Sequence, residues 1–411
     1  MRFDNEQGTC YDIKGGYFHG ENKDLHFEQC KKCMQIYLGE KRNNEMPICI
    51  CIEIKFRRIK MKTFLNKKPV KIIISIVLAL VLIVCVCNGY FASVALKEQK
   101  GVAVCDKWSA EDTYTPDYAQ SLEIEKDDFK ILCLTDIHIR NFASFGACLG
   151  TNFILDGMGE IQLKQLINEV KPDLIVVGGD TVLTAWNDIC TQQFCDFMEK
   201  FEIPWAPVFG NHDYEGRADK SKLCEIYESA KHCLFKCGPE GMNGMGNYIV
   251  NLTRNNEVVY SLFMLDDGQY RIVDGAITDG GVNENQIEWY KWAVNGINKT
   301  SGKNVPNMAF MHVPVPEYKE LNDNFEMGLR QEDSCTARDN DGFFEAFQAN
   351  GGTHMFAGHD HNNNFVADYN GVKLCYMTKS SYNCYFSSKT LGGTVITIDE
   401  NNNVNLEIKD F

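Results

Sequence analysis

The chain has 411 residues, of which 44% are hydrophobic, and its formal net charge is −15 at pH 7. This length allows one large domain with additional segments, or two domains. The hydrophobic content is that of an ordinary globular protein. The strong negative charge argues against a nucleic acid as partner, because its phosphate backbone would be repelled.

A long apolar stretch lies in the first quarter of the chain. Ile72–Cys87 carries no charge, and the apolar residues Tyr90–Leu96 follow it closely. Together they are long enough for a spanning helix, which requires roughly 20 residues. Lysine and arginine are concentrated on the N-terminal side only. We therefore predict a transmembrane signal-anchor over residues 70–96, with the tail 1–69 in the cytoplasm and the remainder of the chain outside it.

A cleaved signal peptide is the alternative to this anchor. If translation starts at Met61, residues 61–95 resemble a secretory signal with a cleavage site at Ser93-Val94-Ala95. The tail 1–69 would then not be part of the mature protein, and the protein would be secreted. We favour the uncleaved anchor, because the apolar run is longer than most signal cores.

Eleven of the 18 cysteines follow the apolar stretch. Outside the cytoplasm some of them can form disulfides, although sequence does not give their connectivity. Cys133 and Cys375 lie in apolar runs with strand character, so we expect them to be buried thiols. The candidates for disulfides include Cys190, Cys195, Cys224, Cys233 and Cys237.

Regular patterning begins at Phe129, after a polar segment, 97–128, that we interpret as a linker. The first predicted elements alternate between strands and helices. They are Lys130–Leu134, Glu160–Val170, Leu174–Val177, a helix containing Phe194–Phe201, and Trp205–Phe209. Such βαβαβ alternation predicts a parallel sheet covered by helices.

The second half of the chain is richer in strands. We predict helices at Lys222–His232, Asn285–Ile297 and Gly342–Ala349. We predict strands at Asn247–Leu252, Val258–Leu265, Met308–Met311 and His354–Ala357, and further strands from Val372 to the end. Late antiparallel strands beside an earlier parallel set indicate two sheets packed face to face.

Polar clusters directly follow five of the strand-like runs. Because the ends of parallel strands gather at one edge of a sheet, these clusters are expected to form one site. They are Thr135-Asp136-Ile137-His138, Gly178-Gly179-Asp180, Gly210-Asn211-His212-Asp213, His312, and Gly358-His359-Asp360-His361.

The gathered side chains are carboxylates, imidazoles and one amide, and no cysteine joins them. This mixture suits Mn, Fe or Zn in a hydrolytic role and argues against a structural thiolate site. Seven candidate ligands are too many for one catalytic ion with an open position. They fit two ions, roughly 3.5–4 Å apart, that share a carboxylate and clamp the oxygens of an in-line displacement at phosphorus.

The five clusters, in this order, resemble those of the calcineurin-like metallophosphoesterase superfamily. Additional stretches such as Gln286-Ile287-Glu288-Trp289-Tyr290 and His312-Val313-Pro314-Val315-Pro316 are similar to its purple acid phosphatase-related subgroup. The resemblance covers residues 129–411. It implies a four-layer α/β/β/α sandwich with two mixed sheets, preceded here by the N-terminal transmembrane helix.

The resemblance also implies a role for each site residue. The first metal is bound by Asp136, His138 and His361. The second is bound by Asn211, His312 and His359, and Asp180 bridges the two. His212 faces the phosphate, stabilises developing negative charge and protonates the leaving oxygen, and Asp213 orients His212.

One position departs from the purple acid phosphatases. They carry a tyrosine three residues after the bridging aspartate, where this chain has Leu183. We therefore expect no ferric–phenolate bond, and the metals remain open among Mn, Fe and Zn.

These patterns predict a membrane-anchored, extracytoplasmic hydrolase of phosphate monoesters, in which a hydroxide bridging two metals attacks phosphorus. A phosphodiesterase acting on nucleotides or lipid head groups is one alternative, and a non-catalytic binding protein on the same fold is another. The expected partners are a phosphorylated substrate and, through residues 70–96, a membrane. Neither the physiological substrate nor the oligomeric state follows from the sequence.

Overall fold

The computed structural model describes residues 97–140, 152–268, 280–338 and 342–411, with short stretches elsewhere. The chain divides into two compact units, Met1–Leu82 and Ile83–Phe411. In the first unit, β1 (Arg2–Asp4) pairs antiparallel with β2 (Thr9–Tyr11). The predicted membrane segment 70–96 lies, apart from isolated positions, outside the described residues. Among those that are described, no helix has the length and apolar character needed to cross a membrane.

The second unit contains a five-stranded mixed sheet in the order β16-β15-β4-β5-β6. The strands β4, β5 and β6, which come from the βαβαβ pattern, pair in parallel. β15 pairs antiparallel with β4, and β16 pairs antiparallel with β15. The strands are β4 (Phe129–Leu134), β5 (Leu174–Gly178), β6 (Trp205–Val208), β15 (Gly392–Ile398) and β16 (Val404–Asp410).

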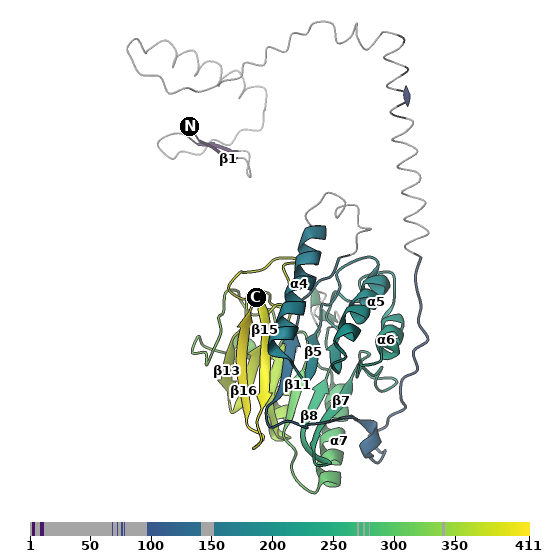
Figure 1. Ribbon diagram of the computed structural model, residues 1–411, viewed down its shortest axis with the longest axis vertical. Coiled ribbons are helices and arrows are strands. Elements are labelled where there is room, and N and C mark those ends of the chain that lie inside the picture. The colour runs from purple at the N-terminus through teal and green to yellow at the C-terminus, as the bar shows by residue number, and fades with distance from the viewer. Residues whose placement is uncertain are drawn as a thin grey trace, which may run out of the picture. The chain divides into compact units, whose positions relative to one another are not determined.

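A seven-stranded mixed sheet, in the order β13-β14-β12-β11-β8-β7-β3, packs against the first (Figure 1). Its strands are β3 (Gln120–Glu123), β7 (Tyr248–Arg254), β8 (Glu257–Met264), β11 (Asn307–Phe310), β12 (Gly352–Ala357), β13 (Val366–Tyr369) and β14 (Val372–Tyr376). A separate hairpin joins β9 (Arg271–Val273) and β10 (Ala276–Thr278).

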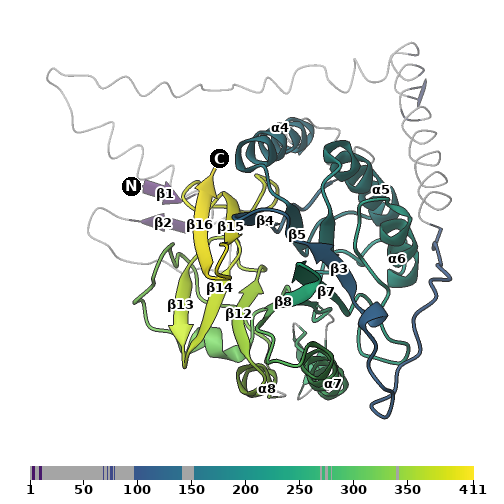
Figure 2. The same ribbon diagram turned by 60° about the horizontal axis from the view of Figure 1, so that its bottom comes forward.

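Helices cover the outer face of each sheet, as Figure 2 shows. On the five-stranded sheet lie α4 (Asn152–Val170), α5 (Asn187–Met198) and α6 (Lys220–Ser229). On the seven-stranded sheet lie α7 (Glu284–Ser301) and α8 (Phe343–Ala349). Short 3-10 helices are η1 (Pro116–Tyr118), η3 (Glu199–Phe201) and η4 (Pro316–Lys319). The predicted α/β/β/α layering with two mixed sheets is confirmed.

The strand β11 is buried at all four positions, and three of its residues, Met308, Ala309 and Phe310, are apolar. Side chains of a strand alternate between the two faces of a sheet. Met308 and Phe310 lie in the core between the sheets, where Phe310 stacks on Phe356 with ring centroids 4.8 Å apart. Ala309 and Met311 lie in the second core, beneath the outer helices. A strand buried on both faces reads as a continuous apolar run.

The segment 97–128, which we interpreted as a linker, is partly built into the domain. Its strand β3 pairs in parallel with β7 at the edge of the larger sheet. The strand was missed because only one of its four residues, Leu122, is apolar and its burial alternates between half-buried and exposed positions. Upstream of it, Tyr114 and Tyr118 pack against the Trp292 ring of α7 at centroid distances of 5.5 and 4.9 Å.

A disulfide ties this same segment to the domain. Cys105 is bonded to Cys237, across a sequence separation of 132 residues. Of the cysteines that we considered for disulfides, Cys195 and Cys224 are instead buried thiols, and burial raises their pKa. The expectation of buried thiols at Cys133 and Cys375 is confirmed.

We predict that the double substitution Cys105→Ser with Cys237→Ser lowers the free energy of unfolding by about 2–5 kcal/mol, because the disulfide restricts the unfolded chain. Urea denaturation of the domain measures this loss. Wild-type protein in reductant is the control and should match the double variant. Equal midpoints for oxidised wild type and variant would contradict the prediction.

Candidate metal centre

Five strands bring the site together from both sheets. β4, β5 and β6 end at one edge of the smaller sheet, and β11 and β12 end beside them in the larger one. The turns after these strands hold several non-glycine residues at positive φ, which costs roughly 1–2 kcal/mol each. They are Asp136, His138, Asp180 and His359, with φ of 53, 49, 49 and 76°. Such strain is characteristic of functional sites.

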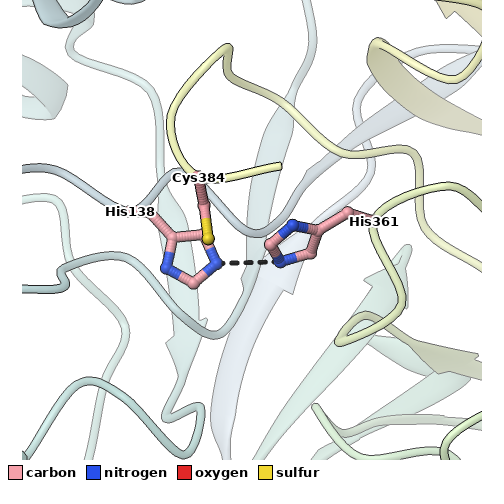
Figure 3. Close-up of side chains that lie close together, drawn as sticks. All are labelled: His138, His361 and Cys384. Atoms are coloured by element: carbon pink, nitrogen blue, oxygen red, sulfur yellow. Dashed lines mark hydrogen bonds between the residues drawn. The ribbon is translucent and has the colours of Figure 1, made fainter. Parts of the chain in front are cut away.

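A first group of side chains joins the turn after β4 to the turn after β12. Nε2 of His138 lies 2.9 Å from Nε2 of His361 (Figure 3). Oδ1 of Asp136 lies 3.3 Å from Nε2 of His361 and 3.7 Å from Nε2 of His138. All three residues are buried. They are the three that the sequence assigned to one metal.

A second group lies beside the first. Oδ1 of Asn211 is 3.1 Å from Nδ1 of His359, and the rings of His359 and His312 are 5.3 Å apart, edge to face. Nδ1 of His312 is hydrogen-bonded to the carbonyl oxygen of Gly178 at 2.8 Å, so Nε2 points into the site. These are the three residues that the sequence assigned to the other metal.

Asp180 lies between the two groups. Its Oδ2 is 3.6 Å from Nε2 of His138 in the first group and 3.2 Å from Nε2 of His312 in the second. Its Oδ1 accepts a hydrogen bond from the backbone N–H of His212 at 2.9 Å. One carboxylate therefore faces both sets of side chains, the position expected of a bridging ligand.

The residues fit a pair of transition-metal ions. Oδ1 of Asp136 and Nε2 of His312 are buried and make no hydrogen bond of good geometry. Such groups are costly unless another partner satisfies them. Two imidazole nitrogens that face each other at 2.9 Å are likewise arranged as ligands are. Carboxylate, imidazole and amide groups together suit Mn, Fe or Zn.

Asp180, Asp136 and His138 have pKa values that leave them able to bind a cation at pH 7, whereas His312 must first lose a proton. Burial raises the pKa of Asp180, but the neighbouring His312 and His138 outweigh this effect, so that the pKa lies below its usual value. The pKa of Asp136 is held well below its usual value by His138 and His361 in the same way, against the effect of burial. Burial lowers the pKa of His138 to about 4, so its ring is neutral at pH 7. Burial also opposes the charged form of His312, but the Asp180 carboxylate raises its pKa to about 9.

His212 lies at the open side of this cluster. Its side chain is 32% exposed, whereas the two imidazoles of the first group, His138 and His361, are buried. Its ring centroid is 5.6 Å from that of His138. Nδ1 of His212 is 2.7 Å from Oε2 of Glu215. A carboxylate at this distance orients the ring.

The structure corrects the prediction that Asp213 orients His212. Oδ1 of Asp213 accepts the backbone N–H of Val182 at 2.9 Å, and Oδ2 accepts that of Gly210 at 2.8 Å. The side chain is fully buried, and burial raises its pKa to about 7. Asp213 thus links the turn that contains Gly210 to the backbone at Val182. Glu215, rather than Asp213, contacts the His212 ring and orients it.

Sequence reasoning also missed a sixth loop, which follows β14 at the same edge. Nζ of Lys379 donates to the carbonyl oxygen of Asp136 at 2.6 Å, and burial lowers its pKa to about 8. Sγ of Cys384 lies within 4.8 Å of the ring nitrogens of His138 and His361. The statement that no cysteine joins the site was therefore wrong. No motif marks this loop; only its place after a parallel strand could have drawn attention to it.

Comparison with known proteins adds an independent finding. The sequence pattern described as "Calcineurin-like phosphoesterase" matches residues 129–363. "Probable inactive purple acid phosphatase 14" of Arabidopsis thaliana is 29% identical in an alignment 287 residues long that covers 62% of this chain and 71% of that protein. "Phosphatase DCR2" of Saccharomyces cerevisiae is 28% identical over 62% of this chain and 48% of its own length.

A solved structure, of a dimetal phosphatase from Danio rerio, is 12% identical with a TM-score of 0.42, over 66% of this chain and 93% of that one. The match to the family's sequence pattern, not the structural similarity, assigns the chain to a family. It spans more than half of the 411 residues and contains all the strand ends that form the cluster. The chain belongs to the calcineurin-like phosphoesterase family.

Proposed function

We propose that the protein hydrolyses phosphate monoesters at a dinuclear metal site. The observation that carries the proposal is the convergence of six candidate ligands around a seventh, Asp180, whose Oδ2 lies within 3.6 Å of Nε2 of both His138 and His312. Asp136, His138 and His361 hold the first ion, and Asn211, His312 and His359 hold the second. When bound, the two ions supply Lewis-acid stabilisation of the phosphoryl oxygens and activation of water.

His212 acts on the substrate rather than on metal. It is the most exposed of the site imidazoles with a carboxylate partner, and its ring faces His138 across the opening. Protonated, it stabilises negative charge that develops on the phosphoryl group and donates a proton to the leaving oxygen. Glu215 holds the ring in place through its contact with Nδ1.

Several relatives are named probable inactive phosphatases, and this bears on whether the present chain is an enzyme. The names describe those proteins. In this chain every predicted ligand is present and all seven converge, which supports hydrolysis over a binding role on the same fold. A phosphodiesterase differs only in the substrate that the open side accepts, and a comparison of mono- and diester substrates distinguishes the two.

The proposed location is extracytoplasmic, with the domain anchored to a membrane through residues 70–96. The disulfide between Cys105 and Cys237 supports it, because such bonds persist mainly in oxidising compartments. The proposed metals are Mn, Fe or Zn, and the proposed partner is a phosphorylated compound.

We predict that Asp180→Asn lowers kcat on an aryl phosphate by more than 100-fold, because one neutral amide cannot bridge two cations as a carboxylate does. Steady-state kinetics on aryl phosphate measures the loss, and circular dichroism checks folding. Asp196→Asn, the same change at an exposed position of α5, is the matched control and should retain full activity. Full turnover by the Asp180 variant would refute the bridging role.

We predict that His212→Ala lowers kcat by roughly 10²–10⁴-fold, as loss of a general acid does. Glu215→Gln should have a smaller effect, of roughly tenfold, because it only orients the ring. His232→Ala is the matched control: its Nδ1 is also 2.7 Å from a carboxylate, that of Glu199, but outside the site. A smaller loss in the His212 variant than in the Glu215 variant would show that the roles are wrong.

We predict that removal of metal by a chelator lowers the melting temperature, because the buried carboxylates and imidazoles lose their partners. Mn or Zn at 100 times its dissociation constant should restore about 2.7 kcal/mol of stability. Differential scanning calorimetry measures this without any substrate. The Asp180→Asn variant should gain less from the same addition, and an unchanged melting temperature in the wild type would argue against a metal site.

A further inference from the structure

Cys384 is the one cysteine among the described residues that lies with the site imidazoles. Its Sγ and one ring nitrogen each of His138 and His361 all lie within 4.8 Å of one another. Figure 3 shows the sulfur beside the His138 ring, on the side that faces His361. The three residues come from loops after β4, β12 and β14, so the sequence does not place them together.

The loop that carries Cys384 is fastened on one side to the turn after β4. Oγ of Ser381 donates to the carbonyl oxygen of Ile137 at 2.6 Å. Nδ2 of Asn383 donates to the same oxygen at 3.3 Å. Both residues precede Cys384 and are buried. The position of Cys384 relative to His138 is therefore set by hydrogen bonds, not by a freely moving loop.

The residue after Cys384 fastens the loop to His361. Nδ1 of His361 lies 2.8 Å from the carbonyl oxygen of Tyr385, and the Tyr385 ring stacks on that of His361 with centroids 4.1 Å apart. Because a carbonyl oxygen only accepts, Nδ1 carries the hydrogen and a neutral ring presents the lone pair of Nε2 to the site. This hydrogen-bond pattern is the one that orients metal-binding histidines.

A buried carboxylate oxygen completes the group. Oδ1 of Asp136 is buried, makes no hydrogen bond of good geometry and lies 3.3 Å from Nε2 of His361. This oxygen indicates a bound ligand independently of the cysteine, because an unsatisfied buried oxygen requires a partner. A cation that satisfied this oxygen would lie beside Nε2 of His361, and His361 is one of the two imidazoles grouped with the thiol.

We propose that Cys384 binds the first metal as a thiolate, together with Asp136, His138 and His361. The inference rests on the dinuclear site of the proposed function. On binding, the thiol proton is released to solvent and the sulfur forms the bond to the metal. Thiolate and imidazole ligands favour Zn or Fe over Mn. The first position is thereby more selective for the softer metals than the second, which has an amide and two imidazoles but no thiolate.

The test measures the reactivity of the thiol in the full-length protein. Iodoacetamide is added to metal-free and to zinc-loaded protein, and alkylation at each cysteine is followed by mass spectrometry. Zinc should slow alkylation of Cys384 by at least about tenfold, since a coordinated sulfur reacts slowly. Cys335, the other cysteine with an exposed side chain in the described part of the chain, should react equally under both conditions.

Variants separate coordination from mere shielding. Cys384→Ser and Cys384→Ala should weaken zinc binding by roughly tenfold or more, weaken manganese binding by a smaller factor, and abolish the sulfur-to-cobalt charge-transfer absorption of cobalt-loaded protein. Cys335→Ser is the matched control and should keep all three properties. Because Cys384 is exposed, both substitutions are compatible with folding.

Two results would overturn the proposal. Equal alkylation with and without zinc, in protein that binds two metals, removes Cys384 from the site and leaves the proposed function standing. So does slower alkylation when the serine variant retains zinc affinity and the cobalt spectrum of the wild type. Protein that binds no metal at all overturns both this proposal and the proposed function.

Discussion

A carboxylate buried between two sets of imidazoles is the constraint on which the site depends. Asp180 is 1% exposed, and an ionised group removed from water is costly unless charges and hydrogen bonds replace the water. The His212 N–H, the imidazoles and the proposed cations supply that replacement. The backbone must bend sharply to place it there. Gly179 has φ of +90°, and a Cβ on Gly210 would lie 2.2 Å from Oδ1 of Asp180. These two glycines are required by the position of one carboxylate.

The sheets explain why so many polar groups can be held at one point. Three of the five clusters follow strands that are buried at every position, β5, β6 and β11, so these strand ends are held in place by packing. Short turns then need little further ordering. A site built at the ends of rigid strands is positioned more accurately than one built on long loops.

This arrangement also decides how much the sequence could predict. Clusters at strand ends, such as Gly210-Asn211-His212, can be recognised from the local sequence, because an apolar run stops at a glycine that is followed by candidate ligands. β3 gave no such signal, since Leu122 is its only apolar residue. The partner of His212 was beyond reach for another reason. Asp213 and Glu215 are both near it in sequence, and only the turn geometry, which aims Asp213 at the amides of Gly210 and Val182, selects Glu215.

The loop after β14 contributes to the site although it contains none of the family's motifs. The Lys379 ammonium donates a hydrogen bond to the carbonyl oxygen of Asp136, and the Ser381 hydroxyl donates one to that of Ile137. The loop therefore holds in place the turn after β4, which carries Asp136 and His138. Lys379 also brings a positive charge near two carboxylates in a buried place. With the two proposed cations bound beside that charge, the site would be more positive than its own carboxylates can balance. Such a site attracts a phosphate that bears two negative charges more strongly than one that bears a single charge, which is the physical argument for a monoester as substrate.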